Sequence, residues 1–272
     1  MAGLSPLAQA YDGLILDLDG CLWVGGRAIP GAAAAVNAWR GSGRALVFLT
    51  NDPRSAPEDV VQRLWSHGVR ASQAEVVTSG VVMQDFLADR FPGCTAVVVG
   101  SEAMVRHVRL AGLRVIANES LVPQADVVVL AGYPGLTYED LTWAVRAAYE
   151  GATVVATGRD HLVPSDAGVI PGTGGVVAYV EYCAGAEAIA VGKPGPDAWR
   201  IARERLVVDG PVLAVGDRLD SDVGGAVAAG LDGALVLTGV SSREMADAWD
   251  GAAPVAVARD LAALLLAELP QV

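Results

Sequence analysis

The order of apolar and polar positions along the chain predicts an alternation of strands and helices. Short runs rich in valine, isoleucine and leucine are followed by longer stretches in which apolar residues recur with helical spacing. Wholly apolar runs indicate strands that are buried on both faces, and the longer stretches indicate the helices that cover them. This pattern is typical of a parallel α/β sheet. Strands are expected at 14–16, 45–49, 75–77, 96–99, 113–117, 127–130, 153–156, 188–191, 212–215 and 234–237.

Residues that favour helix ends lie at the boundaries of several of the longer stretches. Gly43 closes a helix expected at 31–42, and Ser55 and Glu58 have the spacing of a capping box for the next helix. The glycine-rich run at 171–175 is expected to join two domains, because it lacks the lysine and serine of a P-loop. Further helices are expected from Thr78 onward and at 101–111, 138–150, 176–184, 197–206, 241–249 and 260–269.

The first strand ends in two carboxylates one residue apart, in the sequence Asp17-Leu18-Asp19-Gly20. Where a strand passes into a loop, both side chains can turn toward one point beyond its carboxyl end, which is where open α/β sheets bind ligands. One carboxylate can attack as a nucleophile while the other transfers a proton, and a divalent cation would offset their repulsion. A simple turn is the alternative. A calcium loop is disfavoured, because Cys21-Leu22-Trp23 follows in place of oxygen ligands.

Polar residues also follow three later strands of the predicted sheet, namely Thr50 with Asn51, Lys193, and Asp217 with Asp222. Taken alone, Thr50-Asn51 is typical of a turn, and the aspartates at 217 and 222 are equally consistent with helix capping. Lys193 stands apart, because it is the one lysine among 19 lysine and arginine residues. A compact ammonium charge is not replaced by the planar fork of arginine, so its place at a strand end favours a phosphate contact.

The spacing of these polar groups predicts two domains. A strand and its helix together take roughly 30 residues, and Asn51 and Lys193 are much further apart than that. The alternation of strands and helices also restarts near Thr95. We therefore expect a doubly wound, Rossmann-like α/β core formed by residues 1–79 and 182–272, with an α/β cap domain inserted at 80–181.

This ordered set resembles the haloacid dehalogenase superfamily of phosphohydrolases, and the place of the cap is similar to that in its NagD-like, p-nitrophenylphosphatase-like branch. The resemblance covers nearly the whole chain and rests on Asp17-Leu18-Asp19-Gly20, Leu49-Thr50-Asn51, Gly192-Lys193-Pro194, and Gly216-Asp217 with Asp222. The chain departs from the usual pattern at Cys21, where threonine or valine is common, and at Gly158, where asparagine is frequent.

The resemblance implies a role for each of these residues. Asp17 would be the nucleophile, and Asp19 the general acid and base. Magnesium would be held by Asp17, Asp217 and the main-chain carbonyl of Asp19, with Asp222 in support. Phosphoryl transfer needs donors and positive charge around the nucleophile. Thr50, Asn51 and Lys193 are accordingly expected to bind the substrate, and Lys193 also to act in catalysis.

Three adjacent polar residues follow a strand of the expected cap: Arg159, Asp160 and His161. A loop at that position can face the substrate, so we expect these residues to bind the leaving group. Simple surface exposure of His161 is the alternative. Because the motifs outside the cap handle the phosphate, the cap loop would set substrate preference.

The composition limits the partners. The net charge is -12, which disfavours nucleic acid and anionic membranes because both select clustered positive charge. Cys21, Cys94 and Cys183 show no metal-type spacing and are odd in number, as expected in a reducing cytoplasm. No apolar run reaches the roughly 18 residues of a membrane span. We expect a cytoplasmic protein without a membrane partner, and a homodimer is left open.

The sequence therefore predicts an enzyme, a magnesium-dependent phosphatase that hydrolyses phosphate monoesters of small metabolites through an aspartyl-phosphate. The resemblance suggests sugar, glycerol, glycolate, nucleotide or pyridoxal phosphates as substrates. A catalytically idle phosphate-binding or regulatory module is the alternative, although the Asp17 and Asp19 pair argues against it. A phosphorylated receiver domain is a third interpretation, and it has no need of a long cap.

Overall fold

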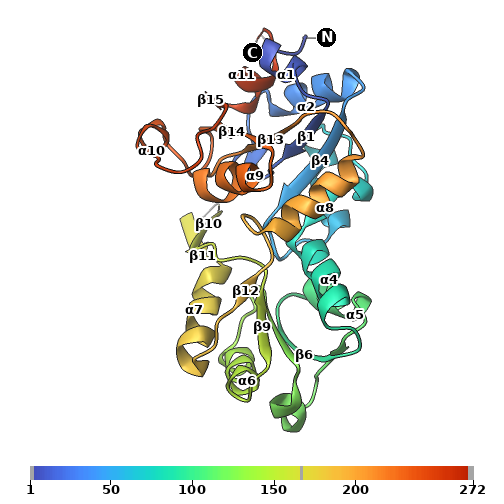
Figure 1. Ribbon diagram of the computed structural model, residues 1–272, viewed down its shortest axis with the longest axis vertical. Coiled ribbons are helices and arrows are strands. Elements are labelled where there is room, and N and C mark those ends of the chain that lie inside the picture. The colour runs from blue at the N-terminus through green and yellow to red at the C-terminus, as the bar shows by residue number, and fades with distance from the viewer. Residues whose placement is uncertain (1–2, 166–167, 269–272) are drawn as a thin grey trace. The chain divides into compact units, whose positions relative to one another are not determined.

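The computed structural model describes residues 3–165 and 168–268, and the chain divides into two compact units (Figure 1). The first unit comprises Met1–Thr50, Pro57–Val77 and Ala198–Val272, and the second comprises Asn51–Ala56 and Thr78–Asp197. The expected boundaries lay near 80 and 181, whereas the second unit also takes in 182–197 and the short segment 51–56. The assignment of a catalytic core and a cap to these units stays a prediction.

The first unit is built on a six-stranded sheet with the strand order β15-β14-β13-β1-β4-β5. Counted in chain order within this sheet, the strands lie 3-2-1-4-5-6, and the order reverses between β1 and β13. Both neighbours of β1 run parallel to it, with Leu14 opposite Leu213 and Leu46. Ligands of doubly wound sheets bind at such a reversal point. The strands are β1 (Gly13–Leu16), β4 (Ala45–Thr50), β5 (Val76–Thr78), β13 (Val212–Gly216), β14 (Asp232–Val236) and β15 (Ala256–Ala258).

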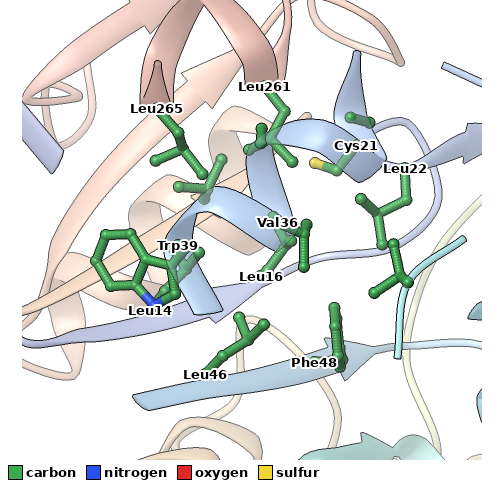
Figure 2. Close-up of a cluster of buried hydrophobic side chains, with 14 of the residues drawn as sticks. Leu14, Leu16, Cys21, Leu22, Val36, Trp39, Leu46, Phe48, Leu261 and Leu265 are labelled. Atoms are coloured by element: carbon green, nitrogen blue, oxygen red, sulfur yellow. The ribbon is translucent and has the colours of Figure 1, made fainter. Parts of the chain in front are cut away.

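Helices α2 (Ala32–Gly41) and α11 (Leu261–Leu265) pack on one face of this sheet, as Figure 2 shows. Leu14 and Leu16 from β1 and Leu46 and Phe48 from β4 meet Trp39 of α2 in that cluster. The residues between them along the strands, such as Ile15 and Val47, are also buried, so the sheet is covered on both faces. Continuous burial explains why these strands are apolar at every position.

The remaining elements of the first unit are short. Near the two ends of the described residues, Leu4 forms an antiparallel bridge with Leu266. These remaining elements are α1 (Pro6–Gln9), a hairpin of β2 (Trp23–Val24) and β3 (Arg27–Ala28), α3 (Pro57–Ser66), the 3-10 turn η1 (Gln73–Glu75), most of α8 (Pro196–Leu206), the π-helical turn η3 (Leu219–Gly224), α9 (Gly225–Ala228) and α10 (Arg243–Asp247).

The second unit has its own parallel sheet, with the order β12-β9-β8-β6-β7. In chain order this is 2-1-3-4-5, another doubly wound arrangement. Threonine and serine N-caps begin three of its helices, at Thr78, Ser101 and Thr137. Its elements are α4 (Ser79–Arg90), β6 (Thr95–Val99), α5 (Glu102–Leu110), β7 (Arg114–Val115), the 3-10 turn η2 (Glu119–Gln124), β8 (Val127–Leu130), α6 (Tyr138–Tyr149), β9 (Thr153–Ala156), a hairpin of β10 (Leu162–Ser165) and β11 (Gly168–Pro171), α7 (Thr173–Ala184) and β12 (Ile189–Ala190).

The predicted elements are found with shifts at their ends, and several short elements were missed. The two hairpins and β15 escaped prediction because their strands are too short to show a period. The run at 171–175, expected to join two domains, lies within the second unit and includes the start of α7 at Thr173. The helix expected at 260–269 ends at Leu265, where Leu266 joins the bridge to Leu4; position 269 lies outside the described residues.

Candidate active site

Three buried carboxylates gather where β1 and β13 end. One oxygen from each of Asp17, Asp217 and Asp222 lies within 4.8 Å of the others. Their residues are 8%, 4% and 3% exposed. Asp17 still belongs to the ladder, because its N–H donates to the carbonyl of Val215 at 2.9 Å. Buried carboxylates need compensation by donors or a cation, and a set made only of oxygen ligands fits a hard divalent ion such as magnesium or calcium.

Main-chain groups fix two members of this cluster. The N–H of Val240 donates to Oδ2 of Asp217 at 2.6 Å, and the N–H of Arg218 donates to Oδ2 of Asp222 at 3.0 Å. Gly20 follows the first carboxylate pair with φ +86°, and a Cβ there would lie 2.5 Å from Cγ of Asp217. The glycine of Asp17-Leu18-Asp19-Gly20 is thus required both for the left-handed turn and for the close approach of Asp217.

Asp19 is held by Trp23, whose contact with this carboxylate was not predicted from the sequence. The indole N–H of Trp23 donates to Oδ1 of Asp19 at 2.9 Å. The Gly20 N–H donates to the Trp23 carbonyl at 2.7 Å, which closes the turn that brings the indole back. The Arg63 guanidinium lies 4.1 Å from the Trp23 ring centroid, and the ring of His67 lies 5.5 Å away. Trp23 is 2% exposed, so its orientation is fixed by packing as well.

Thr50 is the last residue of β4 and is 3% exposed. Its strand pairs with β1 so that Phe48 lies opposite Leu16, and Thr50 therefore reaches the same edge of the sheet as Asp17. The first unit thus brings Asp17, Asp19, Thr50, Asp217 and Asp222 to the carboxyl edge of a single sheet.

Asn51, Asp160 and Lys193 form a connected group in the second unit. Nδ2 of Asn51 donates to the Lys193 carbonyl at 2.9 Å and to Oδ2 of Asp160 at 3.2 Å. The Lys193 N–H donates to Oδ1 of Asn51 at 2.8 Å. Lys193 is 5% exposed, a rare position for a lysine that has no function or partner.

The other two residues of the predicted cap loop have different surroundings. Arg159 donates to both carboxylate oxygens of Glu181, at 2.6 and 3.1 Å, and to the Ala188 carbonyl at 2.9 Å. The hydrogen bond from Arg159 lowers the pKa of Glu181. His161 is exposed, and its carbonyl accepts from the Gly172 N–H at 2.8 Å. Of the three, Asp160 is the one whose side chain is joined to Lys193 through Asn51.

Comparison with known proteins identifies the family. A family model described as haloacid dehalogenase-like hydrolase matches residues 14–114, and a second, HAD-hydrolase-like model matches 190–264. The D-glycerol 3-phosphate phosphatase of Mycobacterium tuberculosis is 34% identical over 98% of this chain and 76% of its own length. The chain belongs to the haloacid dehalogenase-like hydrolases. The expected family and α/β fold are confirmed, and so is the expected enzyme class, that of the phosphatases.

Two further relatives support this family assignment. The acid sugar phosphatase of Staphylococcus saprophyticus is 31% identical, covering 86% of this chain and 89% of that protein. The crystal structure of glycerol phosphate phosphatase from M. tuberculosis in complex with magnesium has a TM-score of 0.89 at 32% identity, covering 96% of this chain and 78% of that one. In the part of this haloacid dehalogenase-like chain that the structure describes, we find no helix that is both long and apolar enough to span a membrane.

Proposed function

We propose that this protein hydrolyses phosphate monoesters of small metabolites with magnesium as its cofactor, through an aspartyl-phosphate at Asp17. The observation that carries the proposal is the buried group of Asp17, Asp217 and Asp222 at the reversal point of the first sheet. A relative binds magnesium in its crystal structure, which supports the choice of ion. When bound, magnesium would offset the charge of these carboxylates and of the phosphate.

The chemistry requires two displacements at phosphorus. The Asp17 carboxylate attacks phosphorus and forms an acyl phosphate, while the bond from phosphorus to the ester oxygen breaks and Asp19 protonates that oxygen. Water then attacks the same phosphorus, Asp19 accepts its proton, and the bond to Asp17 breaks to release inorganic phosphate. Trp23 fixes Oδ1 of Asp19 through its indole N–H, which holds the carboxyl group in one orientation for both proton transfers.

Thr50 and Lys193 complete the phosphate site in this proposal. The Thr50 hydroxyl is a hydrogen-bond donor at the edge of the sheet where Asp17 lies, and Lys193 provides the positive charge. Burial of Lys193 keeps water from screening that charge, so its effect on a developing anion is larger than that of an exposed lysine.

The substrate proposed is a phosphorylated sugar or polyol of small size. Support comes from two relatives, one a D-glycerol 3-phosphate phosphatase and the other named acid sugar phosphatase. The loop at Arg159, Asp160 and His161 is proposed to set the preference among such substrates. An odd number of cysteines without metal-type spacing supports work in the cytoplasm.

Phosphate release from glycerol 3-phosphate, sugar phosphates and 4-nitrophenyl phosphate, with and without magnesium, tests this function. We expect release that depends on magnesium, and a loss on the order of a thousandfold or more in Asp17→Asn, which removes the attacking group. The matched control is Asp12→Asn, an exposed aspartate just before β1, and it should keep wild-type turnover. Magnesium binding without release from any substrate would favour an idle binding module instead.

A further inference from the structure

Asn51 makes a paired contact with the main chain of a single residue, Lys193. Its side-chain oxygen accepts from the Lys193 N–H at 2.8 Å, and its side-chain nitrogen donates to the Lys193 carbonyl at 2.9 Å. A side-chain amide that bonds both peptide groups of one residue fixes the position and the direction of the chain there. The two residues are 142 positions apart in the sequence, so this pairing is a tertiary contact and no local turn produces it.

The third hydrogen bond reinforces the direction in which the amide points. Nδ2 of Asn51 also donates to Oδ2 of Asp160 at 3.2 Å. If the amide were rotated by half a turn, its oxygen would face two acceptors, the Asp160 carboxylate and the Lys193 carbonyl, and its nitrogen would face the N–H of Lys193. Asp160 therefore adds to the preference that the N–H and the carbonyl of Lys193 already impose on the amide.

Glycines on both sides of the group leave space for these contacts. A Cβ at Gly192 would lie 2.2 Å from the Thr157 carbonyl oxygen and 2.7 Å from Oδ1 of Asn51. A Cβ at Gly158 would lie 3.3 Å from Oδ2 of Asp160. The residue before Lys193 must be a glycine for the Asn51 side chain to reach the Lys193 main chain.

These contacts use both N–H groups of the Asn51 amide, one for each acceptor. We infer that Asn51 is a positioning residue, which fixes the main chain of Lys193 and so the place from which its ammonium group reaches the substrate phosphate. Asp160 reinforces the orientation of Asn51 for this task. The inference rests on the proposed function of Lys193, and it gives Asn51 a role other than the direct substrate contact expected from the sequence.

The physical gain is preorganisation. A lysine side chain has a flexible stem of four carbons. An error in the position of its Cα is passed on to the ammonium group, and a displacement of about 1 Å there can lower the rate a hundredfold. The segment that begins with Asn51 is itself fastened within the second unit, because the Ser79 hydroxyl donates to the Asp52 carbonyl at 3.0 Å. Asn51 thus holds the main chain of Lys193 in a fixed position.

The test is a double-mutant cycle on the full chain with magnesium and 4-nitrophenyl phosphate. Asn51→Ala should lower kcat by roughly ten- to fiftyfold while KM changes less than about threefold. Lys193→Ala should lower kcat by more, and adding Asn51→Ala to it should cause no further loss, because Asn51 acts through the lysine. Asp17→Asn provides the background rate, and the thermal midpoint of each protein shows that it is folded.

Two conservative variants sharpen the cycle. Asp160→Asn keeps an acceptor for the Asn51 amide, so its loss in kcat should be smaller than that of Asp160→Ala, which removes the acceptor. Asn51→Asp keeps the acceptor for the Lys193 N–H but sets a carboxylate against Asp160 and the Lys193 carbonyl, so its loss should match or exceed that of Asn51→Ala. It also keeps the inference testable if the alanine protein fails to fold.

The outcomes separate this inference from the proposed function. Wild-type turnover in Asn51→Ala or Asn51→Asp overturns the inference, as does a loss in the double variant equal to the product of the two single losses, while the phosphatase function stands in either case. Wild-type turnover in Lys193→Ala overturns both the lysine's role and the inference. Wild-type turnover in Asp17→Asn overturns the proposed mechanism by itself.

Discussion

The two units are built on the same kind of sheet and differ in what lies at its reversal point. In the first, Asp17 and Asp217 follow the adjacent strands β1 and β13. In the second, the corresponding strands β6 and β8 are followed by Gly100 and Ala131.

The second reversal point is also filled. The Gly132 N–H donates to Thr173 Oγ1 at 3.0 Å, and a Cβ at Gly132 would lie 3.2 Å from the Thr173 main chain, so the first turn of α7 packs against the strand end. A doubly wound sheet offers a crevice at this edge, but its side chains decide whether the crevice becomes a site. The fold alone therefore does not show where an active site lies, because the two reversal points of this chain carry different side chains.

The largest effect that the comparison predicts concerns the lysine of the second unit. Lys193→Arg keeps the charge and changes the shape of the head group, so we expect turnover to fall by roughly a hundredfold or more, measured with 4-nitrophenyl phosphate. Far-ultraviolet circular dichroism should stay unchanged. The reverse exchange at an exposed arginine of the same unit, Arg109→Lys in α5, should be nearly neutral. Equal, small effects of both exchanges would remove Lys193 from the phosphate site.

A smaller effect is expected at Trp23 in the first unit. Trp23→Phe keeps a ring for Arg63 to cover but removes the hydrogen bond to Asp19, so proton transfer to the leaving group should suffer. We expect kcat to fall about tenfold for glycerol 3-phosphate and less for 4-nitrophenyl phosphate, whose leaving group needs little protonation.

The control for Trp23→Phe is Trp65→Phe. The indole of Trp65 also donates a hydrogen bond, to the Ala71 carbonyl at 2.9 Å, but Trp65 is 62% exposed. It should leave both rates unchanged. If Trp23→Phe slowed both substrates equally, the hydrogen bond to Asp19 would not act in leaving-group protonation.

The sequence predicted which polar residues lie at strand ends. It did not predict the contacts between side chains that are far apart in the chain. Asp17, Thr50 and Asp217 could be predicted because each lies at the end of an apolar strand or directly after it, and parallel strands place their ends at one edge. Trp23 could not, since its contact with Asp19 depends on a turn at Gly20 that no period reveals. The same holds for Asn51 and Lys193, whose pairing depends on tertiary structure.

The loop at 159–161 shows a second limit of sequence reasoning. Three neighbouring polar residues were expected to act together, yet Arg159 is bound to Glu181 and Asp160 to Asn51. Adjacent side chains in an extended segment point in different directions, so proximity in sequence did not imply a shared target. Arg63 likewise covers the Trp23 ring only because the folded turn places the ring there.

The smallest expected effect concerns one tyrosine in each unit and the free energy of unfolding at alkaline pH. Tyr11 in the first unit donates to Oδ2 of Asp232 at 2.9 Å, and Tyr133 in the second donates to Oδ2 of Asp140 at the same distance. Burial, followed by the hydrogen bond and charge of Asp232, raises the pKa of Tyr11 from 10.0 to about 12. The pKa of Tyr133 is raised by the same kinds of cause, with burial first.

Because the folded protein keeps the Tyr11 proton to higher pH than the unfolded chain does, this tyrosine stabilises the fold fully below pH 10, and the contribution is lost as the pH rises from 10.0 to about 12. Tyr11→Phe should therefore flatten the fall of the unfolding free energy over that range, as measured by urea denaturation at a series of pH values. Tyr133→Phe should flatten it less, because Tyr133 is only half-buried whereas Tyr11 is 6% exposed. An alkaline slope that Tyr11→Phe leaves unchanged would show that Tyr11 does not ionise on unfolding in this range.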